Sequence, residues 1–479
     1  MKHAIDFFSP KHVKVETTFR TEVLAGVTSF FASIFTILAV PNMIGIGGPD
    51  GYANIRNAVF VAAVISAVIG CLFMAFIAKM PLVVYPAMGT TSYFAFSALP
   101  MIVVLSGDEN LARLTQYQIG MFLILITGVL FSILAVTGLT DKILNGIPKN
   151  IKIATVPAIG LFITLLGLRL SGLVVGTPST FVAFANLRNL RNWATLEPSE
   201  RSALLGAIVA FIGLLFLGFL HYKKVKASFV IAIVVTAILA YVTGAYSIDN
   251  FTFSLGQQFR DWANYGLFRF DAVSIWSFSS IGPVIGVVLS IILALLLTNA
   301  LDAIATTFGI AKGAGLVKDD NDMEGRKYVN KGVVADALSS VVGACLGGAP
   351  NTTVVSGSAG VNAGGRTGLT SLVVAILTAL LLIAGPFVGL IPNVAIAPAL
   401  IFVGCLMLSG LKDLDFSDMT DYLPAFVALI MVVFTFNIGT GICLALLTHI
   451  LLKLVTGRVK EISLVSVIVT ILFLLQFIL

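Results

Sequence analysis

Two short stretches decide the fold: YPAMGTTSYFAFSA (residues 85–98) and GAPNTTVVSGSAGV (residues 348–361). Each begins beside a proline, Pro86 or Pro350, and each is rich in Gly, Ser and Thr. Long apolar runs surround both. A polar break in a helix is tolerated inside a membrane only where its backbone groups meet protein, water or a ligand. The two stretches therefore predict a matched pair of broken helices within a membrane domain.

The composition of the whole chain agrees with this prediction. Of its 479 residues 58% are apolar and only 11% are charged, and the mean hydropathy is +1.03. A soluble domain carries about 25% charged residues, so a cytosolic enzyme, a secreted disulfide scaffold and a nucleic-acid module are excluded. The cysteines form no Cys-x-x-Cys pair and the histidines lack metal-ligand spacing, so we expect neither a metal nor a cofactor. These residues are Cys71, Cys345, Cys405, Cys443, His3, His12, His221 and His449.

The spacing of the apolar runs predicts an all-α polytopic membrane protein, because about 20 apolar residues are needed to cross a bilayer. Seven segments are expected in the first half, at 22–44, 57–79, 82–98, 117–138, 150–172, 201–221 and 225–246. Seven more are expected in the second half, at 280–308, 330–348, 350–363, 367–388, 392–410, 420–437 and 439–456. A last apolar stretch, 461–479, should lie along the interface or pack beside the bundle.

The distribution of charge predicts the orientation. With the N-terminus on the cytoplasmic side, most of the 29 Lys and Arg residues fall on that side of a fourteen-segment chain. Basic residues concentrate in cytoplasmic loops, so we expect a multi-pass protein of the cell (inner) membrane.

The two halves also resemble each other. The fifth segment contains IPKNIKIATVPAIGL and the twelfth IPNVAIAPALIFVG, each with Ile-Pro followed by Pro-Ala. Because seven segments is an odd number, two such repeats must face opposite ways across the membrane. Inverted repeats with interrupted helices in matching positions are typical of transporters.

The interrupted elements provide the candidate binding site. Their hydroxyl groups, small residues and helix N-termini suit a small polar ligand, although tight packing of small residues is the alternative interpretation. The expected substrate-binding residues in these elements are Met88, Gly89, Thr90, Thr91, Asn351, Thr352, Thr353 and Ser356, and Asn299 of the eighth segment joins them.

The eighth segment carries a carboxylate inside the apolar run, Asp302, three residues after Asn299. A carboxylate within a span costs a few kcal/mol even on insertion scales, so it needs a partner, a proton or a water-filled cavity. We expect Asp302 to couple transport to an ion; capping a helix or anchoring hydroxyl groups is the alternative. Asp336, near a basic loop, could form a structural salt bridge or act in gating.

These motifs, together with FRTEVLAGVTSFFASIFTILAVPNMI (19–44), LDAIATTFGIAKGAGL (301–316) and SAGVNAGGRTGLTSLVVAILTALL (358–381), resemble the AzgA-like purine-permease branch of the nucleobase:cation symporter-2 family. The resemblance implies fourteen segments in two inverted repeats, a core domain moving against a gate domain, and proton-coupled uptake of purine bases. The implied divisions are an N-terminal arm (1–21), core segments (22–138 and 280–410, with the gate starting near 392), gate segments (150–246 and 411–456) and a C-terminal helix (461–479).

The chain departs from the family pattern at four positions. Thr91 replaces an Asn, Asn299 an acid, Ser356 a Glu and Phe35 a Tyr, so two carboxylates that would accept hydrogen bonds from purine N–H groups are missing. A site that loses such partners changes its selectivity strongly. We therefore expect a purine-type base such as xanthine, urate, guanine or hypoxanthine, stacked near Phe35, and favour the more oxidised, acidic bases.

Other functions remain as alternatives. An anion or organic-acid transporter of the same fold would not need Asp302. No Ser/His/Asp, HExxH or paired-Asp arrangement supports an enzyme, and an occluded site suits paired broken helices better than an open channel. The expected partners are a nucleobase-like molecule, protons and the lipid bilayer; the sequence leaves dimerisation open.

Overall fold

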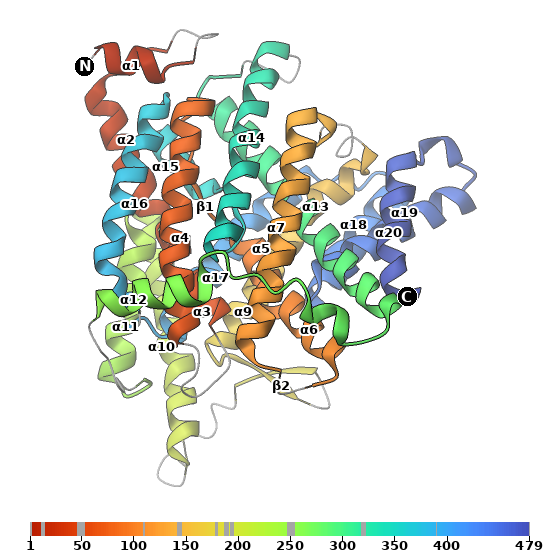
Figure 1. The fold of residues 1–479 in the computed structure, drawn as a ribbon, viewed down its shortest axis with the longest axis horizontal. Coiled ribbons are helices and arrows are strands. Elements are labelled where there is room, and N and C mark those ends of the chain that lie inside the picture. The colour runs from red at the N-terminus through yellow and green to blue at the C-terminus, as the bar shows by residue number, and fades with distance from the viewer. Residues whose placement is uncertain are drawn as a thin grey trace.

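The computed structural model describes residues 2–10, 15–45, 53–108, 111–140, 146–177, 181–185, 191, 196–246, 254–317, 322–388 and 390–478. Most of these residues are helical, and the long helices run side by side between two opposite faces of the molecule (Figure 1). The prediction of an all-α polytopic architecture is confirmed.

The helices of the first half follow the expected segments, except that the third helical run begins at Met88 and continues to Ser106 instead of spanning 82–98. They are α2 (Phe19–Ser33), α3 (Phe35–Ile44), α4 (Ala53–Phe73) with the π-helix η1 (Met74–Ala78), α5 (Met88–Tyr93), the π-helix η2 (Phe94–Ala98), α6 (Leu99–Ser106), α7 (Arg113–Thr137), α9 (Lys149–Leu170), α10 (Pro198–Tyr222) and α11 (Ser228–Val242).

The second half repeats this arrangement. Its helices are α13 (Ile281–Gly313), α14 (Met323–Leu346), the 3₁₀ helix η6 (Val355–Gly357), α15 (Ser358–Asn362), α16 (Gly368–Val388), α17 (Asn393–Met407) with the 3₁₀ helix η7 (Leu408–Asp413), α18 (Met419–Phe434) and α19 (Ile438–Val455).

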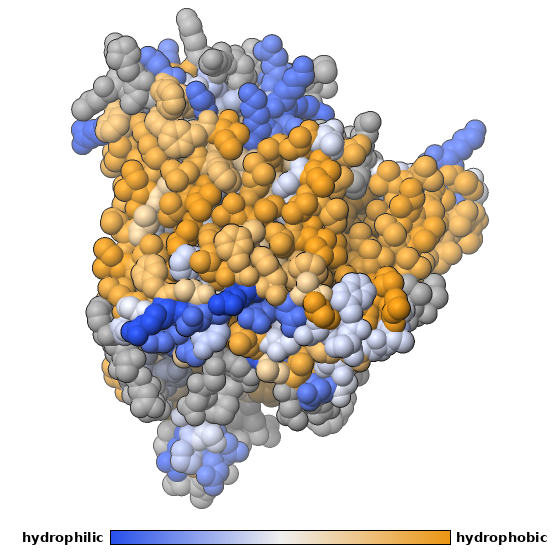
Figure 2. Space-filling view, in the orientation of Figure 1, coloured by the Kyte–Doolittle hydropathy of each residue, from blue (hydrophilic) through white to orange (hydrophobic). Residues whose placement is uncertain are grey.

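A broad apolar band crosses the face of the molecule that Figure 2 shows. Figure 2 shows this band between two faces on which hydrophilic residues gather. Among the described residues, eleven helices are long and apolar enough to cross a membrane, and three shorter apolar helices accompany them. Large apolar side chains, such as those of Leu215, Ile238 and Leu380, are exposed on the surface. Such side chains suit contact with lipid rather than with water.

The two interrupted stretches lie next to each other. The strand β1 (Val84–Pro86) pairs antiparallel with β4 (Asn351–Thr353), with Tyr85 opposite Thr352. The Ala87 amide extends the pairing by donating to the Pro350 carbonyl over 2.9 Å. The backbone groups of both breaks are thus satisfied by each other, which is how non-helical backbone persists inside a bundle.

The two similar segments, α9 and α17, also pack against each other. Their contact is close because Gly160 of α9 faces Gly404 of α17: a Cβ at Gly404 would lie 2.3 Å from the Gly160 carbonyl oxygen. Small residues at equivalent positions let two helix backbones approach closely. The Pro-Ala similarity seen in the sequence therefore marks a packed pair of helices.

Several elements lie outside the expected segments. These are α1 (Lys2–Phe8), the hairpin β2 (Val174–Thr177) and β3 (Phe181–Phe184), α12 (Leu255–Asp261), the π-helix η4 (Trp262–Gly266), and the 3₁₀ helices η5 (Ser274–Ser277) and η8 (Val459–Glu461). The last apolar stretch forms α20 (Leu464–Ile478), which packs against α13 and α19. Of its two expected positions, α20 takes the one beside the bundle.

Candidate functional site

A cavity of about 1590 Å³ lies where α5 begins, beside β4 and α13. Residues from both halves of the chain form its wall, including residues next to β1 and β4. The expected site residues that line it are Phe35, Met88, Gly89, Asp302, Thr352 and Ser356. The sequence thus predicted residues from four separate segments that the fold brings to one space.

The geometry of α5 follows from Pro86. Proline ends β1, and Ala87 precedes the helix in an extended conformation without a side-chain cap. The first amides of a helix lack partners inside it, and Met88 and Gly89 carry those amides into the cavity wall. This end of α5 can therefore donate hydrogen bonds to an uncharged or anionic ligand.

Asp302 is partly buried on α13 and lines the same cavity. Its Oδ1 accepts a hydrogen bond from the Thr306 hydroxyl over 3.3 Å, one helical turn further on. Among the described residues no salt bridge to this carboxylate is found, and the cavity gives it access to a ligand, water or a proton. Asp302 thus lines the cavity; its role in ion coupling stays a prediction.

Three other expected site residues lie behind the cavity wall. Asn299 donates to the Ser340 hydroxyl over 3.1 Å, and Asn351 donates to the Ser339 hydroxyl over 3.0 Å. Thr353 is also buried, and its hydroxyl lies 3.3 Å from that of Thr307. These side chains join α13, α14 and β4 to one another and do not line the cavity; a direct role in binding stays a prediction.

Thr90 and Thr91 are buried on α5 and also do not line the cavity. The Thr90 hydroxyl lies 3.4 Å from the Ala87 carbonyl oxygen. The Thr91 hydroxyl has no hydrogen-bond partner in the structure, and neither do the side-chain oxygens of Asn299 and Asn351. Buried polar groups are normally paired, so these three atoms are exceptions within the wall.

Asp336 on α14 holds β4 in place. Its Oδ2 accepts hydrogen bonds from the Thr353 amide over 2.5 Å, from the Thr353 hydroxyl over 2.8 Å and from the Thr352 hydroxyl over 3.2 Å. The carboxylate is fully buried. Sequence reasoning considered a salt bridge or a gating role for Asp336, whereas the structure makes it the hydrogen-bond anchor of the second interrupted element.

Two residues of the cavity had no sequence signal that pointed to them. Phe229 on α11 stacks on Phe35, and as an apolar residue in an apolar segment it is indistinguishable from packing residues. In the sequence, Lys226 is one of several basic residues in a loop. In the structure, its ammonium group donates to the Thr28 hydroxyl on α2 over 3.3 Å. Only the fold places these two residues in the cavity.

We expect Gly89→Ala to disrupt the cavity wall. A Cβ at Gly89 would lie 2.7 Å from Cγ2 of Ile159 on α9, and the β-branched Ile side chain has little freedom to move. Overpacking of this kind costs about 1–3 kcal/mol, so the apparent unfolding temperature should fall. Gly309→Ala is the matched control, because Gly309 lines the same cavity with nothing within 4 Å of its added Cβ. Gly89→Ala should cost less stability in an Ile159→Ala background than in the unmodified chain, because the clash is then absent. Equal stability of the Gly89→Ala and Gly309→Ala variants would contradict the close packing.

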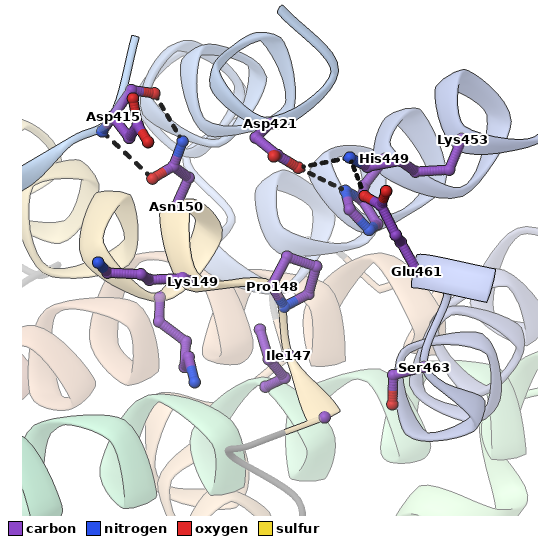
Figure 3. A pocket seen from close by; sticks show the side chains of 12 residues that line it. Ile147, Pro148, Lys149, Asn150, Asp415, Asp421, His449, Lys453, Glu461 and Ser463 are labelled. Atoms are coloured by element: carbon purple, nitrogen blue, oxygen red, sulfur yellow. Dashed lines mark hydrogen bonds and ion pairs between the residues drawn. The ribbon is translucent and has the colours of Figure 1, made fainter. Parts of the chain in front are cut away.

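A second cavity, of about 340 Å³, lies at the start of α9 and holds a cluster of charged residues. Figure 3 shows Asp421, His449 and Lys453 converging there, with Glu461 beside them. The Lys453 ammonium group is 1% exposed and pairs with Asp421 over 3.0 Å and with Glu461 over 2.7 Å. The cluster therefore fastens η8, and with it the start of α20, to α18 and α19.

Arg458 extends this cluster and makes it sensitive to acid. Its guanidinium group pairs with Asp418, and Nε donates to Glu461 over 2.7 Å. The hydrogen bonds from Arg458 and Thr420 hold the pKa of Asp418 well below its usual range, and those from Lys453 and Arg458 lower the pKa of Glu461. Carboxylates with lowered pKa values stabilise the fold above their unfolded pKa and lose that contribution as pH falls through their folded pKa.

We therefore expect the unfolding temperature to fall as pH is lowered from about 5 towards 3. Arg458→Gln should lower stability at neutral pH and make this fall shallower, because the two carboxylates then titrate closer to their unfolded range. Lys460→Gln, at an exposed neighbouring position, is the control. Identical acid profiles for Arg458→Gln and the unmodified chain would refute the role of this ion-pair cluster.

The chain is similar to known permeases over nearly its whole length. The model of the Permease family matches residues 20–446. The guanine/hypoxanthine permease PbuO of Bacillus subtilis (strain 168) is 31% identical, with 97% of this chain and 99% of that protein aligned. The adenine permease AdeP of Escherichia coli (strain K12) is 30% identical, with 96% of this chain and 93% of that protein aligned.

The fold is also found among solved structures. The transmembrane domain of the cyanobacterium bicarbonate transporter BicA matches 90% of this chain and 99% of its own length, with a TM-score of 0.60 and 16% sequence identity. This likeness concerns the fold, two inverted repeats of seven segments. Together with the match to the family model over residues 20–446, it shows that this chain is a multi-pass transporter of the Permease family.

Proposed function

We propose that this protein imports a purine-type nucleobase by secondary active transport, with a proton as the coupling ion. One observation carries the proposal: a single cavity brings together the start of α5, the end of β4, an aromatic ring at Phe35 and the carboxylate of Asp302. The relatives named for guanine, hypoxanthine and adenine transport support the nucleobase as the substrate class. The protein would lie in the cell membrane with its N-terminus on the cytoplasmic side, as its basic loops favour.

The proposed binding mode follows from the cavity wall. The base stacks on Phe35, while the amides at the start of α5 and the hydroxyl groups of Thr352 and Ser356 pair with its polar edge. Thr90, Thr91, Asn299, Asn351 and Thr353 support this wall from behind in the proposed mode. Lys226 adds a positive charge to the cavity, which favours a base with acidic N–H groups, such as xanthine or urate, over a cationic ligand.

The proposed coupling rests on two carboxylates. Asp302 lies on α13 and Asp336 on α14, and these two helices pack against each other. Two carboxylates in one poorly solvated region are not both ionised without a large cost. Because Asp336 is held by donors from β4, Asp302 is the group that exchanges a proton with the cavity.

The proposed movement separates two groups of helices. In one, α4 packs against α14 and α16; in the other, α9 packs against α17 and α18. In the proposed movement the first group belongs to the core and the second to the gate. Alternating exposure of the cavity would come from sliding of the core against the gate.

A binding screen tests the substrate class. The purified full-length protein would be heated with guanine, hypoxanthine, adenine, xanthine, urate, uracil, bicarbonate or sulfate. A ligand that binds the folded state raises the apparent unfolding temperature. At a hundredfold excess over Kd, it adds about 2.7 kcal/mol to the free energy of unfolding. Stabilisation by purines, weakened by Ser356→Ala or Thr352→Val, supports the proposal. Stabilisation by bicarbonate or sulfate alone would replace it with the anion-transporter alternative.

A further inference from the structure

Two phenylalanine rings from distant parts of the chain close the cavity at one point. Phe35 on α3 and Phe229 on α11 have ring centroids 4.4 Å apart, and their planes are inclined by only 15°. Both residues line the large cavity, and they are 3% and 6% exposed. A nearly parallel pair with such a short separation is an offset stack, one of the two favoured arrangements of aromatic rings.

A third ring fixes Phe229 from the side. Phe402 on α17 meets it at a centroid distance of 5.9 Å with an interplanar angle of 72°. Phe229 therefore has one face on Phe35 and is also in edge contact with Phe402. One face of the Phe35 ring is thus covered by Phe229, and a base can stack on that face only by displacing Phe229.

We propose that Phe229 is a specificity-determining residue and that a planar base inserts between Phe229 and Phe35. This inference rests on the proposed function, because it places the same base in the same cavity. Each face of the base gains a stacking contact, whereas a non-planar or tetrahedral ligand such as sulfate gains neither. The paired rings thus select for flat, aromatic ligands, independently of the hydrogen bonds at the base edge.

Insertion also links binding to movement. An aromatic layer needs about 3.5–4 Å between contacting atoms, so the two rings must separate by that amount. Phe35 belongs to α3, which packs on α4, and Phe229 belongs to α11, which packs on α10 and α17. A base between the rings therefore shifts these two groups of helices apart at the level of the cavity.

The alternative is that the two rings are ordinary packing residues. In that case a substitution at Phe229 changes stability but leaves the choice of ligand unchanged. The test therefore reads contact and selectivity in addition to stability, and Phe402 provides the control because its ring touches Phe229 but is absent from the cavity lining.

The first arm of the test uses tryptophan fluorescence. The purified full-length variants Phe229→Trp and Phe402→Trp would be titrated with guanine and hypoxanthine, and the signal of the unmodified chain subtracted. Stacking of the base on the new indole predicts strong quenching in Phe229→Trp and little in Phe402→Trp. Equal quenching in the two variants, while the unmodified chain binds the base, would overturn the inference.

The second arm measures binding by Phe229→Ala and Phe229→Leu. Loss of one stacking face should weaken purine binding about five- to tenfold, with xanthine and hypoxanthine affected alike, and Phe402→Leu should bind as the unmodified chain does. Unchanged or tighter binding by Phe229→Ala would overturn the inference. If the unmodified chain binds no purine at all, it is the proposed function that fails, so the two failures are distinguishable.

Discussion

Asp336→Ala should produce the largest loss of stability of any single substitution in the candidate site. The change leaves three donors of β4 without their acceptor, and the Thr353 amide has no rotatable bond with which to find another. A buried donor without a partner costs about 1–3 kcal/mol, so we expect a total loss of roughly 2–4 kcal/mol. Thermal unfolding of the purified protein measures this loss, and uptake by the variant should be abolished because β4 shapes the cavity.

Asp336→Asn separates the carboxylate charge from the hydrogen bonds. Its amide oxygen can still accept from the Thr353 amide, so most of the stability should return. Ser66→Ala is a useful control for substitution of a buried polar residue outside this network, because the Ser66 hydroxyl donates only to the Ala63 carbonyl. An Asp336→Ala variant as stable as the unmodified chain would show that β4 does not depend on this anchor.

Asp302→Asn should abolish proton-driven accumulation while preserving binding and exchange. The amide cannot carry the exchangeable proton, but it keeps the size of the side chain and can accept from Thr306. When one proton accompanies each base, a gradient of about one pH unit supports about tenfold accumulation. The unmodified chain should reach that ratio in proteoliposomes, whereas Asp302→Asn should only equilibrate the base.

Asp413→Asn is the matched control for this experiment. Asp413 also lines the cavity, but it is exposed at the end of η7. Its substitution removes one carboxylate from the same cavity and should leave accumulation intact. Continued accumulation by Asp302→Asn would assign proton coupling to another group, and loss of accumulation in both variants would point to the charge of the cavity rather than to Asp302.

The sequence predicted the architecture well because its signals are physical constraints of the membrane. Segment lengths are set by the bilayer thickness, and the paired Gly/Ser/Thr stretches marked two polar breaks in matching positions. The similarity of the fifth and twelfth segments proved to be the packed pair α9 and α17. The contact between Gly160 and Gly404 gives this similarity a structural reason.

The composition of the cavity wall could be predicted only in part. Segments that are apolar all round have no periodicity that shows which face is turned inward. Met88 and Gly89 line the cavity while Thr91, a turn or less further on, is buried behind it. The rotation of each helix decides this, and it depends on tertiary packing such as the approach of Gly89 to Ile159.

Ligand-binding residues and packing residues were also hard to tell apart in the sequence. Asn299 and Asn351 have the chemistry of ligand-binding residues, yet their amides bind Ser340 and Ser339 of α14. Phe229 has the chemistry of a packing residue, yet it lines the cavity against Phe35. Contacts between distant segments, which a single sequence does not reveal, make the difference.

Counterflow in proteoliposomes tests the central claim most directly. Liposomes containing the purified full-length protein would be loaded with unlabelled hypoxanthine and diluted into labelled hypoxanthine, guanine or xanthine. The account predicts transient accumulation of the labelled purine, faster under an inward proton gradient and absent for labelled sulfate or bicarbonate. Equilibration of sulfate or bicarbonate without any purine counterflow would contradict it.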